Sequence, residues 1–357
     1  MSGMRLQPGH RRIATVVVTV LVFVALLFVG TTVQVPFVAL GPGPTVNTLG
    51  TVEISSDGKT ETKPVVDITG TPTDPTTGNL NLTTVSVTDG MSLFQSLGMW
   101  LSGTYTLEPR DRLFPPDQTP DQVRKQNEQD MTGSESNATA AALLFLDRPT
   151  KLVVASVAPS GPSADVLRQG DEVLTVAGKS VSTTAEMQAA VKGSAPGSAV
   201  PIGIVRGGQP QTVTVTLAAR PDDAQAGYLG VTPEVVNADP SLKISYNVGD
   251  IGGPSAGMML TLAVIDRLSP GELTGGKFIA GTGTIDDSGE VGPIGGITHK
   301  TRAARDAGAT VFLVPEGNCA EATSDVPDGL TLVKVDTLQS AVDALDDIGA
   351  GRAAPHC

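Results

Sequence analysis

The stretch Asp250-Ile251-Gly252-Gly253-Pro254-Ser255-Ala256-Gly257 decides the fold of the carboxyl-terminal half. Pro254 suits the first position of a helix, because its φ is already fixed near the helical value and its missing N–H is not needed there. Gly253 and Ala256 are small enough to leave room for a bound chain beside Ser255. Unpaired N–H groups at a helix start can stabilise an anionic oxygen. The pattern therefore predicts a serine presented at the start of a helix.

The residues that follow predict a buried helix and a second functional segment. Met258 to Ile265 is apolar on nearly every side, which is typical of a helix enclosed by a core. Further along, Val291 to Lys300 ends in a lysine. A serine hydroxyl needs a base to take its proton, and a lysine can be that base only if desolvation lowers its pKa. The two interpretations are a Ser255/Lys300 pair, or a plain turn followed by a solvated lysine.

From about Gly230 to Ile348 the chain resembles the Lon-type serine proteases. The matching elements, in order, are Gly-Pro-Ser-Ala-Gly around Ser255, Thr282-Gly283, Pro293-Ile294-Gly295-Gly296-Ile297 before Lys300, Ala307-Gly308, and Val311 to Pro315. The resemblance implies that Ser255 is the nucleophile, Lys300 the general base and Thr282 a hydrogen-bond partner close to both. Gly253, Pro254 and Ala256 would support the site. The chain departs from the bacterial Lon pattern at Gly252, where Asp is usual, and at Thr298-His299, where Lys-Glu is usual.

The amino-acid composition limits which classes of protein this chain can belong to. The chain has 357 residues, of which 40% are hydrophobic and 17% charged, so two or three folded domains are expected. A net charge of −13 and the absence of any basic stripe argue against a nucleic-acid partner. With three histidines, none clustered, we expect no zinc site, and no cofactor is expected.

The amino terminus predicts a membrane anchor. Residues 1–12 carry Arg5, Arg11 and Arg12, and the segment 13–35 that follows contains no charged residue. At about 1.5 Å rise per residue it can cross a hydrocarbon core of about 30 Å. The positive-inside rule then makes residues 1–12 a cytoplasmic tail and places the rest outside the cell membrane. A cleaved signal peptide is the alternative, although the apolar run is longer than a usual h-region and lacks a clear cleavage site.

Two further regions precede the Lon-like domain. Residues 36–140 form a strand-rich membrane-proximal region with strands near 65–68 and 80–87, a helix over 91–101, and a polar connection over 110–137 that includes a short helix. Residues 141–220 resemble a PDZ domain, through Ser160-Gly161-Pro162 and Gly170-Asp171-Glu172-Val173-Leu174-Thr175-Val176-Ala177-Gly178. PDZ domains add a peptide to a sheet edge. The family's Gly-hydrophobic-Gly-hydrophobic loop, sought before the first strand at residues 143–147, is missing there.

The two cysteines, Cys319 and Cys357, are candidates for a disulfide, because outside the membrane a pair is more often bridged than free. The bridge would hold the tail, residues 351–357, to the loop after Pro315.

Together these features predict an α+β protein: a tail, a transmembrane helix, a strand-rich region, a PDZ-like β domain and a Lon-like α+β domain over 228–350. The order resembles the membrane-anchored PDZ/Lon-type proteases of Gram-positive and related bacteria. It implies an ATP-independent serine endopeptidase that cleaves unfolded or flexible proteins outside the membrane, and a homo-oligomer. Gly271 to Lys277 resembles a phosphate-binding loop, but Phe278 replaces the required Ser or Thr, so no ATPase is expected. A membrane-tethered PDZ scaffold with an inactive Lon-like domain is the alternative.

Overall fold

The computed structural model describes residues 8–56, 59–249 and 251–357, and it divides into two compact units. One unit consists of Met1–Pro44 with Val85–Val123, and the other of Thr45–Thr84 with Arg124–Cys357. Each unit is thus built from stretches that are separated in sequence. The expected domain order along the chain therefore differs from the division seen in space.

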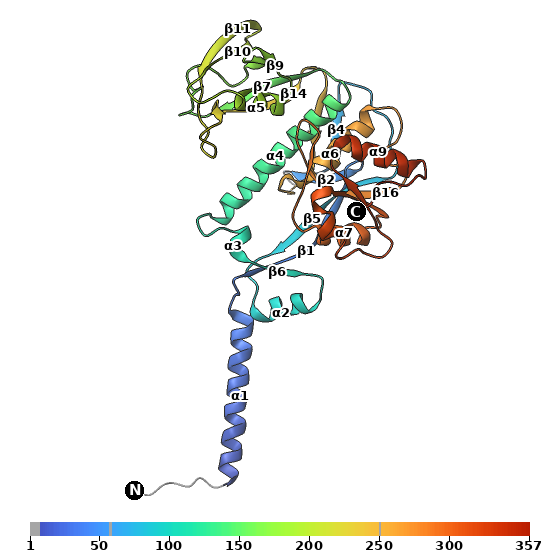
Figure 1. Ribbon diagram of the computed structural model, residues 1–357. Helices are drawn as coiled ribbons and strands as arrows, with labels where there is room; N and C mark the ends of the chain where they lie inside the picture. The colour runs from blue at the N-terminus through green and yellow to red at the C-terminus, as the bar shows by residue number, and fades with distance from the viewer. Residues whose placement is uncertain (1–7, 57–58, 250) are drawn as a thin grey trace. The chain divides into compact units, whose positions relative to one another are not determined.

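The smaller unit begins with the long apolar helix α1 (Pro8–Thr32), drawn in dark blue in Figure 1. Its segment Ile13–Thr32 is long and apolar enough to cross a membrane, and only 6% of it is buried. The rest of this unit comprises the first part of β1 (Phe37–Asn47), α2 (Leu93–Leu101), β6 (Thr106–Pro109) and α3 (Arg110–Leu113). Strands β1 and β6 pair antiparallel from Phe37↔Pro109 to Leu40↔Thr106.

The larger unit contains a parallel sheet that carries the proteolytic half. Its strands run in the order β20 (Thr331–Val335), β19 (Val311–Pro315), β16 (Phe278–Gly281) and β5 (Asn79–Thr88). The register Phe278↔Asn79 to Gly281↔Leu82 joins β5 to β16. A strand expected within the membrane-proximal region thus joins the sheet of the Lon-like half, and its residues Leu80 and Leu82 are buried there.

Helices supply the rest of this core: α6 (Gly257–Leu268), α7 (Ile297–Asp306) and α9 (Leu338–Gly349). Every residue of α6 from Gly257 to Asp266 is buried. The predicted all-round burial of this helix is confirmed. Since α6 begins directly after Ser255, the serine is held by one of the most enclosed elements of the protein.

Helix α4 (Pro120–Phe145) differs from the expected polar connection with a short helix. It is one continuous helix of 26 residues, visible in green in Figure 1. Its buried side chains are mostly small, including Ser134, Ala138, Ala141 and Ala142. Small residues let a helix pack closely without a strong hydrophobic pattern, and this explains why the sequence alone suggested an exposed connection.

The PDZ-like half is a sheet with the strand order β11 (Gln209–Thr216), β10 (Ala199–Arg206), β8 (Glu172–Val176), β7 (Thr150–Val157), β14 (Val231–Asn237). Helix α5 (Thr184–Lys192) packs on it. Strand β14 pairs with β7 along its whole length, and Leu229 and Val235 join the PDZ-like core. The residues just after 228, where the sequence predicts the start of the Lon-like domain, thus pair with the PDZ-like sheet.

Short elements complete the chain. They are β2 (Thr51–Ser56), β3 (Lys59–Pro64), β4 (Val66–Thr69), β9 (Lys179–Ser180), β12 (Ala218–Ala219), β13 (Gly227–Tyr228), β15 (Lys243–Tyr246), η1 (Pro254–Ala256), β17 (Thr284–Ile285), β18 (Val291–Gly292), η2 (Glu316–Asn318) and α8 (Cys319–Ala322). Residues 1–7, including Arg5, and Asp250 lie outside the described residues, so the predictions made for them have no structural counterpart here.

Candidate active site

Ser255 lies in a short 3-10 turn, η1, that leads directly into α6. Pro254 occupies the first position of this turn, as the sequence predicts. The preceding Gly253 has φ +89°, a conformation that side-chain-bearing residues rarely adopt, so a glycine is required there. The serine is half-buried while Ala256, the next residue, is buried. The hydroxyl is therefore fixed by a rigid element yet remains within reach of solvent.

Lys300 approaches Ser255 from a different element, the first turns of α7. This helix begins after Gly296, which has φ +68°. Lys300 is only 3% exposed, although lysine side chains are almost never fully buried without a partner. Its Nζ lies 2.8 Å from Oγ of Ser255 and 2.8 Å from Oγ1 of Thr282.

Thr282 connects the two segments. It is fully buried, and its Oγ1 accepts from Lys300 while donating to the carbonyl oxygen of Ser255 at 3.0 Å. The N–H of Gly283 donates to the same carbonyl, also at 3.0 Å. The backbone of the serine is thus fixed by two hydrogen bonds from the segment after β16. The structure brings together the three side chains that the sequence singled out.

Burial changes the acidity of the lysine. Removal of its ammonium group from water lowers the pKa of Lys300 to about 8. The cause of this shift is desolvation by burial, which disfavours the charged form of the lysine. The lysine can therefore lose its proton at a pH at which an exposed lysine would stay charged.

Helix α4 contacts the segment around the serine through side chains and backbone that the sequence did not suggest. The carbonyl of Asn127 accepts from the N–H of Gly253 at 2.9 Å. Oγ of Ser134 donates to the carbonyl of Pro254 at 3.1 Å. Asn137 donates through Nδ2 to the carbonyl of Ile285 at 3.1 Å. No sequence signal marks these three residues, because polar side chains in a polar stretch predict exposure.

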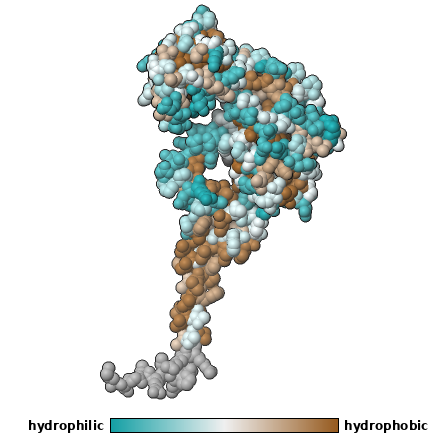
Figure 2. Space-filling view, viewed as in Figure 1, coloured by the Kyte–Doolittle hydropathy of each residue, from teal (hydrophilic) through white to brown (hydrophobic). Residues whose placement is uncertain are grey.

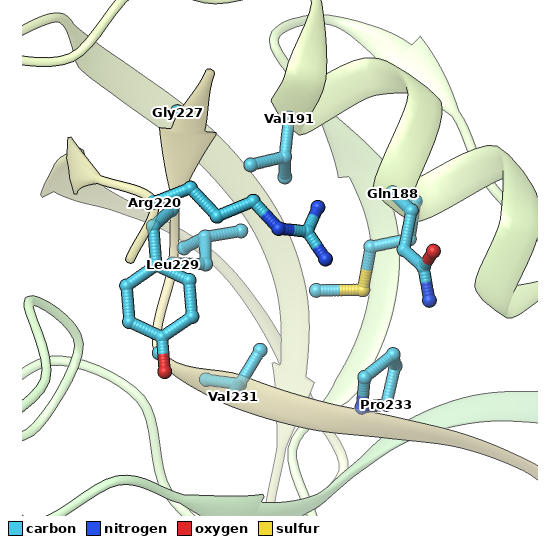
Figure 3. A pocket seen from close by; sticks show the side chains of 10 residues that line it. Gln188, Val191, Arg220, Gly227, Leu229, Val231 and Pro233 are labelled. Atoms are coloured by element: carbon cyan, nitrogen blue, oxygen red, sulfur yellow. The ribbon is translucent and has the colours of Figure 1, made fainter. Parts of the chain in front are cut away.

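A second concave site lies in the PDZ-like half, between α5 and β14. It is lined by Met187, Gln188 and Val191 from the helix, by Val231 and Pro233 from the strand, and by Arg220 and the segment Gly227 to Gly230. Figure 3 shows the guanidinium group of Arg220 pointing into this pocket, towards the side chains of α5. The floor is apolar and the rim carries one cation, an arrangement that suits an extended peptide.

Comparisons with known proteins match these two halves. Residues 122–217 match the family model of the PDZ domain, and residues 239–348 match that of the Lon protease (S16) C-terminal proteolytic domain. The chain carries a PDZ domain and a Lon-type proteolytic domain. The mixed α+β fold expected from the sequence is confirmed.

The relatives of the Lon-type domain are much longer proteins. A Lon protease of Phenylobacterium zucineum is 33% identical over 126 residues, which cover 34% of this chain and 16% of that protein. A Lon protease of Mycolicibacterium smegmatis is 32% identical over 104 residues, which cover 29% and 13%. This chain thus matches less than a fifth of either relative. The PDZ domain of an SdrC-like protein from Listeria monocytogenes is 23% identical and covers 23% of this chain and 86% of that chain, with a TM-score of 0.22.

The PDZ domain reveals a motif that the sequence interpretation placed elsewhere. The loop entering β14 reads Tyr228-Leu229-Gly230-Val231, and its last three residues fit the hydrophobic-Gly-hydrophobic part of the family loop. Residues 143–147, where this loop is expected from the sequence, belong to the end of α4 and the turn after it. In the sequence this run stands at residue 228, the predicted start of the Lon-like domain.

The Lon-type domain is closed near its end by a disulfide between Cys319 and Cys357, whose Cα atoms are 5.1 Å apart. The neighbouring Asn318 accepts from the N–H of Ile294 and donates to its carbonyl oxygen. Ile294 lies in the loop that leads into α7. The disulfide thus anchors a segment that positions the start of the helix carrying Lys300.

Proposed function

We propose that this protein is an ATP-independent serine endopeptidase with Ser255 as nucleophile and Lys300 as general base. The observation that carries the proposal is the 2.8 Å distance between Nζ of Lys300 and Oγ of Ser255, with the lysine buried. A pKa of about 8 leaves part of the lysine neutral near neutral pH. Neutral Lys300 can then accept a proton, as a general base must.

The reaction follows from this pair. Nζ of neutral Lys300 takes the proton of Ser255 while Oγ attacks the scissile carbonyl carbon and forms a tetrahedral intermediate. The intermediate collapses, the C–N bond breaks, and the leaving amine takes the proton from Lys300. An acyl-enzyme remains, which water hydrolyses with Lys300 again as base. Thr282 holds the ammonium form through its hydroxyl oxygen.

Backbone N–H groups would stabilise the oxyanion of the intermediate. The N–H of Gly253 is already used by the carbonyl of Asn127, and Pro254 has none. We therefore assign the donors to the N–H groups of Ser255 and Ala256, at the start of α6. Gly253 and Pro254 support the site by shaping the turn.

The substrates are proposed to be unfolded or flexible polypeptides. Lon proteases proper have an attached ATPase that unfolds their clients, and the phosphate-loop-like stretch of this chain lacks the Ser or Thr that binds magnesium. A domain without that motor depends on chains that are already extended. By family resemblance we also propose a homo-oligomer.

The PDZ domain is proposed to recruit these chains by their carboxyl termini. Strand β14 ends the sheet order, so a peptide can pair with its free edge. Arg220, which also pairs with Asp222 at 3.0 Å, and the Leu229-Gly230 loop line the pocket, and we assign the terminal carboxylate to them. Peptides with a free carboxyl terminus should bind more tightly than the same peptides amidated, and Arg220→Ala should reduce that difference about threefold, since the guanidinium group is exposed. Equal binding of both peptides by wild type, measured by fluorescence anisotropy, would contradict this role.

A contact between the two domains supports gating as well as recruitment. The N–H and hydroxyl of Thr184, at the start of α5, donate to the buried carboxylate of Asp287, both at 2.7 Å. Asp287 follows β17, which begins directly after Thr282-Gly283. A peptide that moves α5 would disturb this contact. Peptide addition should change the rate of casein cleavage by wild type but not by Asp287→Ala, and an equal change in both would contradict gating.

We propose that α1 anchors the protein in the cell membrane, with its amino terminus in the cytoplasm and both domains outside. The arginines before the apolar segment support this orientation through the positive-inside rule. A cysteine-accessibility assay in whole cells, with single cysteines placed on either side of α1 in a Cys319→Ser/Cys357→Ser background, tests it. Labelling of the amino-terminal cysteine by a membrane-impermeant reagent would show that the amino terminus is outside, and it would contradict the proposed orientation.

The decisive experiment compares the full chain with Ser255→Ala and Lys300→Ala, using unfolded casein without ATP. We expect cleavage by wild type alone. All three proteins should have the same circular dichroism and size-exclusion profile, so that lost activity cannot be assigned to lost folding. Cleavage by Ser255→Ala would exclude this mechanism.

The alternative, a membrane-tethered PDZ scaffold, predicts a different result. A scaffold cleaves nothing in any of the three forms and does not react with a serine-directed phosphonate at Ser255. Labelling of Ser255 in wild type, lost in Lys300→Ala, would favour the protease even if casein is a poor substrate.

A further inference from the structure

Helix α2 presents an apolar face that is mostly exposed, although the ring of Phe94 also contacts Gly30 of α1. Large apolar side chains at helical spacing are exposed along it: Leu93, Phe94, Leu97, Trp100 and Leu101. Trp100 is 58% exposed and Leu101 is 69% exposed. Single exposed apolar residues are ordinary, but five on one nine-residue helix form a patch, and such patches mark binding surfaces.

The helix is firmly attached to the end of α1. Gly30 is the buried residue of the apolar span, and a methyl group added there would collide with the ring of Phe94. The N–H of Val35 donates to the carbonyl of Met91 at 2.9 Å, and Gln34 forms an isolated bridge with Ser92. Helix α2 therefore keeps a fixed height relative to α1 within this unit.

The height of α2 can be given relative to the end of the apolar span of α1. Gly30 lies two residues before Thr32, the last residue of the apolar span, so at about 1.5 Å per residue it is roughly 3 Å from the end of the span. If α1 crosses the membrane, α2 lies at the level where hydrocarbon meets headgroups. Tryptophan is enriched at that level, because its ring is apolar and its N–H is polar.

We propose that the α2 face, defined as Leu93, Phe94, Leu97, Trp100 and Leu101, lies in the interfacial layer of the lipid bilayer on the side where α1 emerges. The inference rests on the proposed membrane anchoring. Lipid is the occupant because the face continues the exposed apolar surface of α1, and brown surface covers α1 and continues beyond its upper end in Figure 2.

Charge supports the same occupant. The sequence from Gly90 to Leu107 contains no charged residue. Charges resume on both sides of this stretch, at Asp89 and Glu108, where they pair with Arg110 and Arg112. Ser92 and Gln95 form a capping box, so the helix is folded before it meets lipid. An apolar helix with paired charges at its margins suits a neutral acyl layer.

The chain contains its own probe, because Trp100 is its single tryptophan. The full chain is placed in phosphatidylcholine nanodiscs whose lipids carry bromine either near the headgroup, at acyl carbons 6 and 7, or near the bilayer centre. We expect shallow bromine to lower Trp100 emission by about half or more, and deep bromine to lower it less. Emission quenched only by aqueous acrylamide would place the face in water and overturn the proposal. Emission quenched by neither reagent would place it against protein, such as a second copy, and would also overturn it.

A matched pair of variants tests the face itself. Leu97→Gln with Leu101→Gln adds two amides within the face, and Gly98→Gln adds one amide at its border, one turn after Phe94, where nothing lies within 4 Å of an added Cβ. The first should reduce quenching by shallow bromine at least about twofold, while the second should leave it unchanged. Equal quenching in all three proteins would contradict the proposal.

Failure of the anchoring itself has its own signature. Protein that elutes apart from the nanodiscs overturns the anchoring and this inference together. Protein that stays with the nanodiscs while Trp100 remains unquenched by bromine overturns the α2 face alone.

Discussion

Lys300 and Trp100 occupy opposite environments, and each is placed against its ordinary preference. The lysine is 3% exposed and the tryptophan is 58% exposed. Charged side chains are rarely buried without a charged partner, and aromatic rings are rarely left open to water. Both arrangements cost stability in an isolated chain. Each exposure has a use under the proposals made above: burial would let Lys300 act as a base, and exposure would let Trp100 contact lipid.

The first prediction removes the buried charge. Lys300→Met keeps an unbranched side chain in the same space and deletes the base, so casein cleavage should fall by a factor of about 10³ or more. The variant should still fold. Its free energy of unfolding should exceed that of wild type by about 1 kcal/mol, because no ammonium group must be buried. Activity assays and thermal unfolding measure the two effects. A destabilised Lys300→Met would mean that the lysine stabilises the fold, and it would contradict the interpretation that the lysine is buried at a cost in stability.

The second prediction concerns Thr282, the hydroxyl partner of Lys300. Thr282→Val is of similar size but removes the oxygen, and it should lower kcat about 10-fold to 100-fold, in line with a lost hydrogen bond to a charged group. Loss of this acceptor destabilises the ammonium form, so the pKa of Lys300 should fall further. Thr282→Ser, which retains the hydroxyl, is the control. A Val variant with reduced kcat but an unmoved pH profile would assign Thr282 to packing alone.

The third prediction follows from the lowered pKa of Lys300. Because the base works only when neutral, and its pKa is about 8, kcat/KM should rise with pH through that value. Between pH 7 and pH 9 the neutral fraction increases about tenfold, and the rate should follow it. The matched control is cleavage of the same casein by a protease whose rate is flat in this range. A rate that falls as the pH rises would exclude a neutral lysine.

The smallest effect is expected on α4. Ser134→Ala removes the hydroxyl that donates to the carbonyl of Pro254, and kcat should decrease about threefold to tenfold through a looser nucleophile turn. Thr132→Ala on the exposed side of the same helix is the control, since its hydroxyl bonds only within α4. Equal kcat values in both variants would mean that the hydrogen bond from Ser134 does not help to position Ser255.

The sequence was most informative where function depends on neighbouring residues. Ser255 with its flanking glycines, and Lys300 at the end of its motif, were recognisable because each motif is contiguous. Strand pairing between β5 and β16 was not predictable, because it joins distant segments and depends on the whole core. Helix α4 was missed because burial of alanine and serine produces no strong hydrophobic period.

The pairing of β14 with the PDZ-like sheet was hard to predict for a related reason. Strand β14 is separated from its partner β7 by the whole domain, and contains Pro233, which weakens a strand pattern. Local signals thus located Ser255, Thr282 and Lys300, while the elements that hold them came from contacts between distant segments.

An insertion within α4 would rotate the residues after it relative to the residues before it. Ser134 and Asn137 face the catalytic segments, while Ala140 packs in the PDZ core. One residue inserted between Asn137 and Ala140 would turn the following side chains by about 100°, since a helix has 3.6 residues per turn. Four inserted residues would nearly restore the angle, at about 6 Å of extra length. Related chains should therefore tolerate length changes in the loops around this helix far more readily than within it.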